Sequence, residues 1–146
     1  MRTKQQKATL SCTHRIRVRF SEIDSMQVVW HGEYIRYFED GREEFGRKYS
    51  GIGYQDIAAS GSFAPIVDAQ LQFKKPLRIN DEALIETRYI DSEAAKICFE
   101  YTIRRASDNQ IVATGSTMQV FVDHNYELEL LQPDFFKAWR TKWINR

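Results

Sequence analysis

Hydrophobic and polar residues alternate over several short stretches of the chain, as they do in strands that bury one face. The first of these stretches covers residues 12–20, where apolar residues alternate with arginines. The residues of this strand that we expect to face a core are Ile16, Val18 and Phe20. Residues 21–30 follow no clear period, so we expect a loop there, and it carries two acids, Glu22 and Asp24.

From residue 32 to about residue 49 the pattern changes to the period of a helix. The apolar positions that share one face of this helix are Tyr34, Tyr37, Phe38, Gly41 and Phe45. A glycine inside a helix costs about 1 kcal/mol relative to alanine, so we expect something to offset Gly41. Close approach of another backbone is the usual reason, and it would set the helix tight against a sheet. Residues 50–53 end the helix, and residues 54–59 suit a short second helix.

The rest of the chain has mainly the pattern of strands. Three alternating apolar sets are Val67, Ala69, Leu71 and Phe73; Ala83, Ile85, Thr87 and Tyr89; and Ile97, Phe99, Tyr101 and Ile103. A last strand is expected from Gln110 to about Asp123. Pro133 and Asp134 suit the start of a helix. The apolar side of this terminal helix is expected to comprise Phe135, Trp139 and Trp143.

This order of elements predicts an α+β fold. Strands joined by tight turns form an antiparallel sheet, and a long helix with an aromatic face needs a sheet to bury that face. We therefore expect a curved antiparallel sheet of about five strands, wrapped around one long central helix, plus a C-terminal helix. Residues 1–10 are expected to form a flexible tail, and residues 11–146 a single domain.

Composition narrows the classes of function. The chain has 146 residues and a net charge of +1, which favours one domain and gives no reason to expect nucleic acid as a partner. Cys12 and Cys98 have neither metal-site spacing nor a CxxC pattern, so we expect two reduced thiols in a cytoplasmic protein. No signal peptide and no apolar run of about 18 residues is present, so membrane insertion is not expected. We expect no metal and no cofactor.

Residues 24–39, DSMQVVWHGEYIRYFE, resemble the signature of the hotdog-fold thioesterases. The similar branch is that of 4-hydroxybenzoyl-CoA thioesterase and the acyl-CoA thioesterases linked to the Tol–Pal system. Its pattern is an aspartate, a short turn, two valines, an aromatic residue, His or Tyr, and then Tyr and Phe-Glu on the helix. The resemblance extends over residues 12–125. It implies a hotdog fold, hydrolysis of acyl-CoA to a free acid and CoA, a place in lipid metabolism, and homodimers that assemble into a homotetramer.

The resemblance also implies a catalytic pair. Asp24 would act as the nucleophile or as the general base on water. The backbone N–H of His31 would polarise the thioester carbonyl, with the imidazole shaping the pocket. The first turn of a helix suits this role, because its N–H groups are unpaired and partly positive. Related enzymes often carry Gly at the position of Gln27 and Asn at that of Glu33, so acyl chain length and the choice between CoA and acyl carrier protein stay open.

The substrate would need an apolar surface and cations. Val29 and Trp30 lie in an unusually apolar loop, and Tyr34 is a core residue that could also line an acyl pocket. The CoA phosphates could meet Lys74, Lys75 and Arg78 at one strand end, or Arg104 and Arg105 at another. Either group could equally be a solvated strand end.

Several alternatives to an acyl-CoA thioesterase are open. Another hotdog branch uses a helical Glu, but for Glu39 a salt bridge is favoured. A hotdog hydratase would have its His closer to its Asp, within a stretch that is absent here. An acyl-carrier-protein thioesterase, or a module that binds acyl thioesters without turnover, would share the fold. The second would usually lack the acid, whereas this chain has Asp24.

Overall fold

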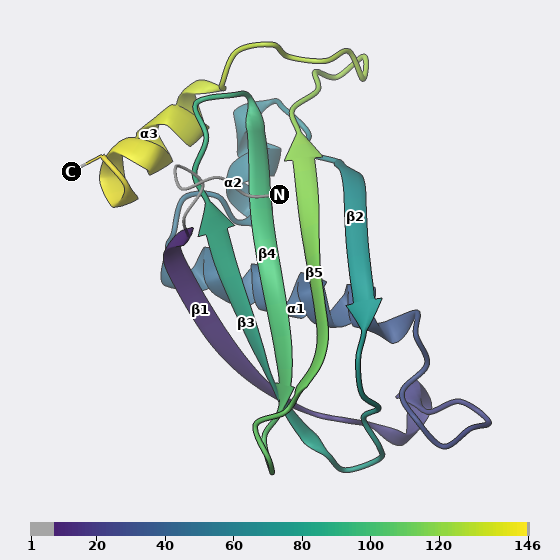
Figure 1. Ribbon diagram of the computed structural model, residues 1–146. Coiled ribbons are helices and arrows are strands. Elements are labelled where there is room, and N and C mark those ends of the chain that lie inside the picture. Colours follow the sequence, from purple (N-terminus) through teal and green to yellow (C-terminus); the bar gives the residue numbers. More distant parts are fainter. Residues whose placement is uncertain (1–7, 146) are drawn as a thin grey trace.

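The computed structural model describes residues 8–145 and has one five-stranded sheet that curves around a long helix, α1 (Figure 1). The elements are β1 (Ala8–Arg17), a 3₁₀ helix (Phe20–Glu22), α1 (Glu33–Lys48), α2 (Tyr54–Ser60), β2 (Ile66–Phe73), β3 (Glu82–Ile90), β4 (Lys96–Arg105), β5 (Ile111–Val120) and α3 (Asp134–Trp143). Neighbouring strands are antiparallel, in the order β1-β3-β4-β5-β2. The predicted α+β architecture is therefore confirmed.

The aromatic face of α1 packs on the inner face of the sheet. Its five buried residues are the five that the helical period predicts: Tyr34, Tyr37, Phe38, Gly41 and Phe45. Phe38 stacks on Tyr101 of β4 with ring centroids 4.2 Å apart, and Phe45 meets Phe99 edge-to-face at 5.0 Å. Stacked and edge-to-face ring pairs add to the free energy gained from burial alone, so this layer supplies much of the core.

Gly41 brings α1 close to β3, as expected, but the contact is with side chains and not with a backbone. A Cβ atom at Gly41 would lie 2.5 Å from the Thr87 hydroxyl oxygen and 2.8 Å from Cγ2 of Ile85. The expectation of a backbone contact was therefore wrong. Both residues belong to the inner row of β3, whose side chains project towards the helix and fill the space that a larger residue would need.

The ends of β1 differ from the expected ends. Residues 8–10, which we assigned to the tail, belong to the strand, and the rest of the expected tail lies outside the described residues. The strand stops at Arg17, so Phe20, which was expected in the core, is 80% exposed. The chain turns into the 3₁₀ helix there because the Glu22 carboxylate accepts the Arg19 N–H at 2.8 Å.

Strand β2 lies at one edge of the sheet, with β5 as its neighbour in the sheet order. The predicted strand is present, but three residues of its expected core row are exposed: Ala69, and Val67 and Phe73, each 55% exposed. An edge strand lacks a partner on one side, so burial of its apolar row depends on what else covers it. Alternation predicted the strand correctly and did not predict its position in the sheet.

Helix α3 closes the core near the C-terminal end of α1. Phe136 and Trp139 are its buried residues, whereas Phe135 and Trp143 of the predicted apolar side are only half-buried. The Trp139 indole N–H donates to the carbonyl of Tyr49, just after α1, at 2.7 Å. Among residues 8–145, no helix is long and apolar enough to cross a membrane.

The close contact at Gly41 gives a prediction for stability. Gly41→Ala should lower the free energy of unfolding by about 1–3 kcal/mol, because overpacking a core forces its neighbours to shift. Gly46→Ala is the matched control in the same helix: a Cβ there would have its nearest contact at 3.5 Å. That control should be neutral or stabilising by up to about 1 kcal/mol. Urea denaturation of both variants measures the difference, and equal stabilities would contradict the proposed role of Gly41.

Candidate active site

The segment before α1 folds into a narrow hairpin that carries Asp24. Ile23 and Val29 form an antiparallel bridge, and the Asp24 N–H donates to the Val28 carbonyl at 2.9 Å. One carboxylate oxygen of Asp24 accepts the Met26 N–H at 2.8 Å, which is the usual hydrogen bond of an Asx turn. The half-buried Asp24 side chain is therefore oriented by its own turn.

Gln27 completes this turn with an unusual backbone conformation. Its φ angle is +66°, in the left-handed region, and its N–H donates to the Asp24 carbonyl at 3.0 Å. Residues with a Cβ atom adopt this region less readily than glycine does. A glycine, which the resembling enzymes often carry at this position, therefore suits the same backbone shape.

The second arm of the hairpin leads into the first turn of α1. The Trp30 N–H donates to the Glu22 carbonyl at 2.9 Å, and the Glu33 N–H donates to the Trp30 carbonyl at 2.9 Å. Within residues 8–145, the N–H groups of His31 and Gly32 donate to no other group. Unpaired N–H groups before a helix carry the partial positive charge of its dipole. They can therefore donate hydrogen bonds to an anionic or polarised oxygen.

An aromatic cluster lies at this end of α1, and it consists of Trp30, His31, Tyr34 and Phe73. Ring centroids lie 5.1 Å apart for Trp30 and His31, 6.3 Å for His31 and Phe73, and 5.3 Å for Tyr34 and Phe73. Trp30 is 48% exposed, and a Cβ atom on Gly32 would overlap its ring. Phe73 was not predicted as a site residue, because its alternation indicated a core position.

The loop between β2 and β3 lies against the hairpin. The Val29 N–H donates to the Leu77 carbonyl at 2.8 Å, and both side chains are buried. Lys74, Lys75 and Arg78 lie in this loop and are exposed. In Figure 1 the hairpin and the loop lie together beyond the end of β2. The structure therefore brings the predicted cations to the same end of the molecule as Asp24 and His31, whereas the buried Val29 belongs to the core.

Arg105, one of the alternative phosphate ligands, holds the loop in place. Its guanidinium donates to the Pro76 carbonyl at 2.6 Å and to Asp108 at 2.7 Å. The Arg105 side chain therefore serves to hold the loop, whereas Lys74, Lys75 and Arg78 are exposed. Tyr34 is nearly buried, and burial raises the pKa of its hydroxyl although Arg105 lowers it in part. The Tyr34 hydroxyl therefore stays protonated.

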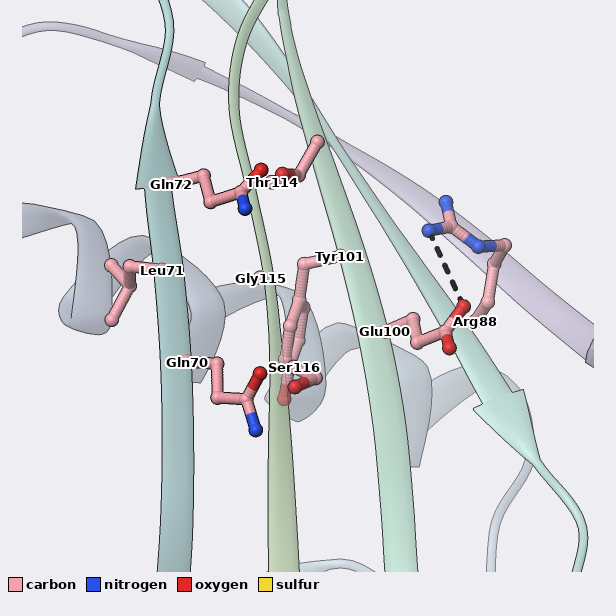
Figure 2. Close-up of a pocket in the computed structure, with 9 residues that line it drawn as sticks. All are labelled: Gln70, Leu71, Gln72, Arg88, Glu100, Tyr101, Thr114, Gly115 and Ser116. Atoms are coloured by element: carbon pink, nitrogen blue, oxygen red, sulfur yellow. Dashed lines mark ion pairs between the residues drawn. The ribbon is translucent and has the colours of Figure 1, made fainter. Parts of the chain in front are cut away.

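A separate polar hollow of about 240 Å³ lies on the other face of the sheet, away from α1 (Figure 2). Its polar side chains come from four strands and are Gln70, Gln72, Arg88, Glu100, Thr114 and Ser116. Arg88 pairs with Glu86 at 3.2 Å and approaches Glu100 at 4.0 Å. None of the predicted site residues lines this hollow, so the hairpin and the aromatic cluster are the better candidate site. Within the described chain, no cluster of His, Cys, Asp and Glu could hold a metal ion.

Comparison with known proteins adds family evidence. Residues 18–140 match the model of the family described as the thioesterase-like superfamily. A Bacillus subtilis protein named "Putative acyl-CoA thioesterase YneP" is 31% identical over 129 residues, which are 88% of this chain and 91% of that protein. The chloroplast acyl-acyl carrier protein thioesterase ATL3 of Arabidopsis thaliana is 29% identical over 111 residues. That match covers 76% of this chain and 58% of ATL3.

A solved structure confirms the fold. The 1,4-dihydroxy-2-naphthoyl-CoA thioesterase Slr0204 from Synechocystis superposes with a TM-score of 0.80, at 20% identity. The superposition covers 93% of this chain and 98% of that one. At this identity the likeness shows the fold, which is the predicted hotdog fold.

The left-handed backbone of Gln27 gives a prediction. Gln27→Gly should be more stable than Gln27→Ala by about 1 kcal/mol, because only glycine lacks the Cβ atom that disfavours a positive φ. Both variants lose the Gln side chain, so their difference isolates the backbone effect. Thermal and urea unfolding measure it. An alanine variant as stable as the glycine variant would contradict the positive φ.

Proposed function

The chain belongs to the thioesterase-like superfamily, and on that premise we propose that it hydrolyses acyl-CoA thioesters to a free carboxylic acid and CoA. The observation that carries the proposal is the pairing of two groups on one hairpin. Asp24 supplies a carboxylate on the first arm, and unpaired N–H groups at His31 and Gly32 follow the second arm. Hydrolysis of a thioester needs both kinds of group: a nucleophile or base, and a donor for the developing oxyanion.

In the proposed mechanism, the thioester carbonyl oxygen accepts the His31 N–H. Asp24 then attacks the carbonyl carbon, which expels the CoA thiolate and leaves an anhydride that water hydrolyses. Alternatively, Asp24 takes a proton from the water that attacks. Both routes end in the acid and CoA. One oxyanion donor of this kind contributes about 3 kcal/mol of transition-state stabilisation.

The acyl group would lie against the aromatic cluster, where the exposed rings of Trp30 and Phe73 offer apolar surface and the buried Tyr34 packs against Phe73. We assign the CoA phosphates to Lys74, Lys75 and Arg78. Two observations support this assignment: the three side chains are exposed, and within residues 8–145 none of them forms an ion pair with a carboxylate. Free cations next to a site are suited to bind phosphate groups.

We further propose that the chain forms a homodimer and that dimers pair into a homotetramer. The exposed edge of β2 supports this, since Val67 and Phe73 there are not covered by any other part of residues 8–145. A mass of one chain in solution would contradict it. We assign the reaction to the cytoplasm, and the free state of Cys12 and Cys98 is consistent with that compartment.

An acyl carrier protein is the second candidate for the carrier of the acyl group. The likeness to ATL3, whose name gives acyl carrier protein as its substrate carrier, favours this alternative. The same acyl group offered on CoA, on pantetheine and on acyl carrier protein separates the candidates. A CoA enzyme should have a lower KM for the CoA thioester than for the pantetheine thioester, because only CoA carries the nucleotide phosphates.

Asp24→Asn tests the proposed reaction. Asparagine keeps the oxygen that accepts the Met26 N–H, so the hairpin should survive while the nucleophile or base is lost. We expect kcat to fall by at least about a hundredfold, the lower range for removal of a general base. The measurement is release of free thiol from a panel of straight-chain, branched and aryl acyl-CoA thioesters.

Glu39→Gln is the control for this variant, because Glu39 is the other acid that a hotdog enzyme could use. It lies exposed on α1 and should retain the activity of the unmodified protein. If no thioester in the panel is hydrolysed faster by the unmodified protein than by Asp24→Asn, the proposed reaction is wrong. A loss confined to Glu39→Gln would transfer the catalytic role to that residue.

A pair of substitutions at His31 separates the N–H from the imidazole. His31→Ala keeps the backbone N–H and should lower kcat by less than about tenfold. His31→Pro removes the N–H and should lower kcat a further hundredfold or so, the usual effect of losing one oxyanion donor. Circular dichroism checks that the proline variant is folded. A similar loss in both variants would assign the chemistry to the imidazole.

A further inference from the structure

We propose that Glu22 and Tyr37 are positioning residues, whose hydrogen bond fixes the separation between the Asp24 carboxylate and the His31 N–H. The inference rests on the proposed function and adds two residues to it. Neither residue was assigned to the site from the sequence.

On one side, Glu22 holds both arms of the hairpin. Its carboxylate oxygen Oε1 accepts the Arg19 N–H at 2.8 Å, which fixes the turn that leads into the first arm. Its main-chain carbonyl accepts the Trp30 N–H at 2.9 Å, at the end of the second arm. Asp24 is two residues after Glu22, and His31 is the residue after Trp30. Both proposed catalytic groups therefore lie within two residues of a contact of Glu22.

On the other side, Glu22 is tied to α1. The Tyr37 hydroxyl donates to the same Oε1 at 2.8 Å. Tyr37 is 2% exposed, and its ring meets that of Tyr34 edge-to-face at 5.7 Å, so its position is fixed by the core. Among the residues that the structure describes, this is the side-chain hydrogen bond that joins the hairpin segment 19–32 to α1. The hairpin thereby takes its position from the helix core.

The protonation states suit a durable contact. Burial, together with the neighbouring Glu22 carboxylate, raises the pKa of Tyr37 strongly, so the hydroxyl keeps its proton and remains a donor. A hydrogen bond to an ionised carboxylate is stronger than one between neutral groups. The Tyr37 hydroxyl therefore remains available to donate to Glu22.

The expected consequence is kinetic. A misplacement of about 1 Å between reacting groups can lower the rate by about a hundredfold. Loss of this contact should therefore reduce kcat, because the acid and the oxyanion donor would no longer face one carbonyl group. It should change KM much less, because Tyr34, Phe73 and the exposed cations Lys74, Lys75 and Arg78 lie outside the hairpin segment 19–32.

Tyr37→Phe is the principal test, since it removes one hydroxyl and keeps the ring in the core. The matched control is Tyr89→Phe. Tyr89 is fully buried on β3, and its hydroxyl donates to the Asp91 carboxylate at 2.9 Å, near α3 and away from the hairpin. In both variants the carboxylate keeps a second donor: Arg19 N–H for Glu22, and Arg140 for Asp91. The two variants should therefore lose similar stability.

We expect Tyr37→Phe to lower kcat by about tenfold or more, because the Asp24 carboxylate and the His31 N–H would be misplaced relative to each other. KM should stay within about twofold of its value in the unmodified protein. Tyr89→Phe should keep kcat within about twofold at temperatures well below its melting point. Glu22→Gln, which keeps an oxygen acceptor, should recover part of the kcat that Glu22→Ala loses. The double variant Tyr37→Phe with Glu22→Ala should be no slower than Glu22→Ala alone, because both changes remove one contact.

The outcomes separate this inference from the proposed function. Equal kcat values for Tyr37→Phe and Tyr89→Phe, with an active unmodified protein and an inactive Asp24→Asn variant, would overturn the positioning role and leave the thioesterase standing. A rise in KM alone for Tyr37→Phe, with kcat unchanged, would also overturn the positioning role. If the unmodified protein is no faster than Asp24→Asn on any thioester, the proposed function fails, and the positioning role fails with it.

Discussion

The contact between Gly41 of α1 and the inner row of β3 is the constraint on which the arrangement of the molecule depends. Because Gly41 has no side chain, α1 lies close to the sheet. The aromatic residues before and after Gly41 along the helix can therefore contact the sheet. Phe38 meets Tyr101 towards one end of the helix, and Phe45 meets Phe99 towards the other. The fixed helix in turn sets where its first turn begins, beyond the end of β2. The candidate site is built at that end.

The sequence predicted most of the fold because its main elements follow simple periods. The face of α1 was predicted residue by residue, since a helix buries one stripe and its apolar residues follow it. The strands β3 and β4 were predicted equally well, because both are flanked by other strands and bury their inner rows. Phe20 and Phe73 were misjudged, since alternation reports a pattern and not the neighbours of a strand. A local capping contact decides the first case, and an edge position decides the second.

The candidate site was less accessible to reasoning from patterns. Asp24 and His31 were singled out by resemblance to a family signature, and nothing in the local periodicity distinguishes Asp24 from Glu22. Tyr37 and Glu22 are 15 positions apart, and their contact depends on how the hairpin packs on the helix. The Val29–Leu77 hydrogen bond joins segments still further apart. Contacts of this kind depend on tertiary packing, which a single sequence does not specify.

The hydrogen bond between Val29 and Leu77, together with the Arg105 contact to Pro76, has a consequence for ligand binding. The first contact connects the hairpin to the loop between β2 and β3, and the second fixes that loop to the end of β4, before any ligand arrives. A flexible loop would lose conformational entropy when a long ligand ordered it, and that loss would weaken binding. Here much of the loss has already occurred during folding. A ligand that spans both segments therefore meets a surface that is already organised, and it can bind more tightly for the same set of contacts.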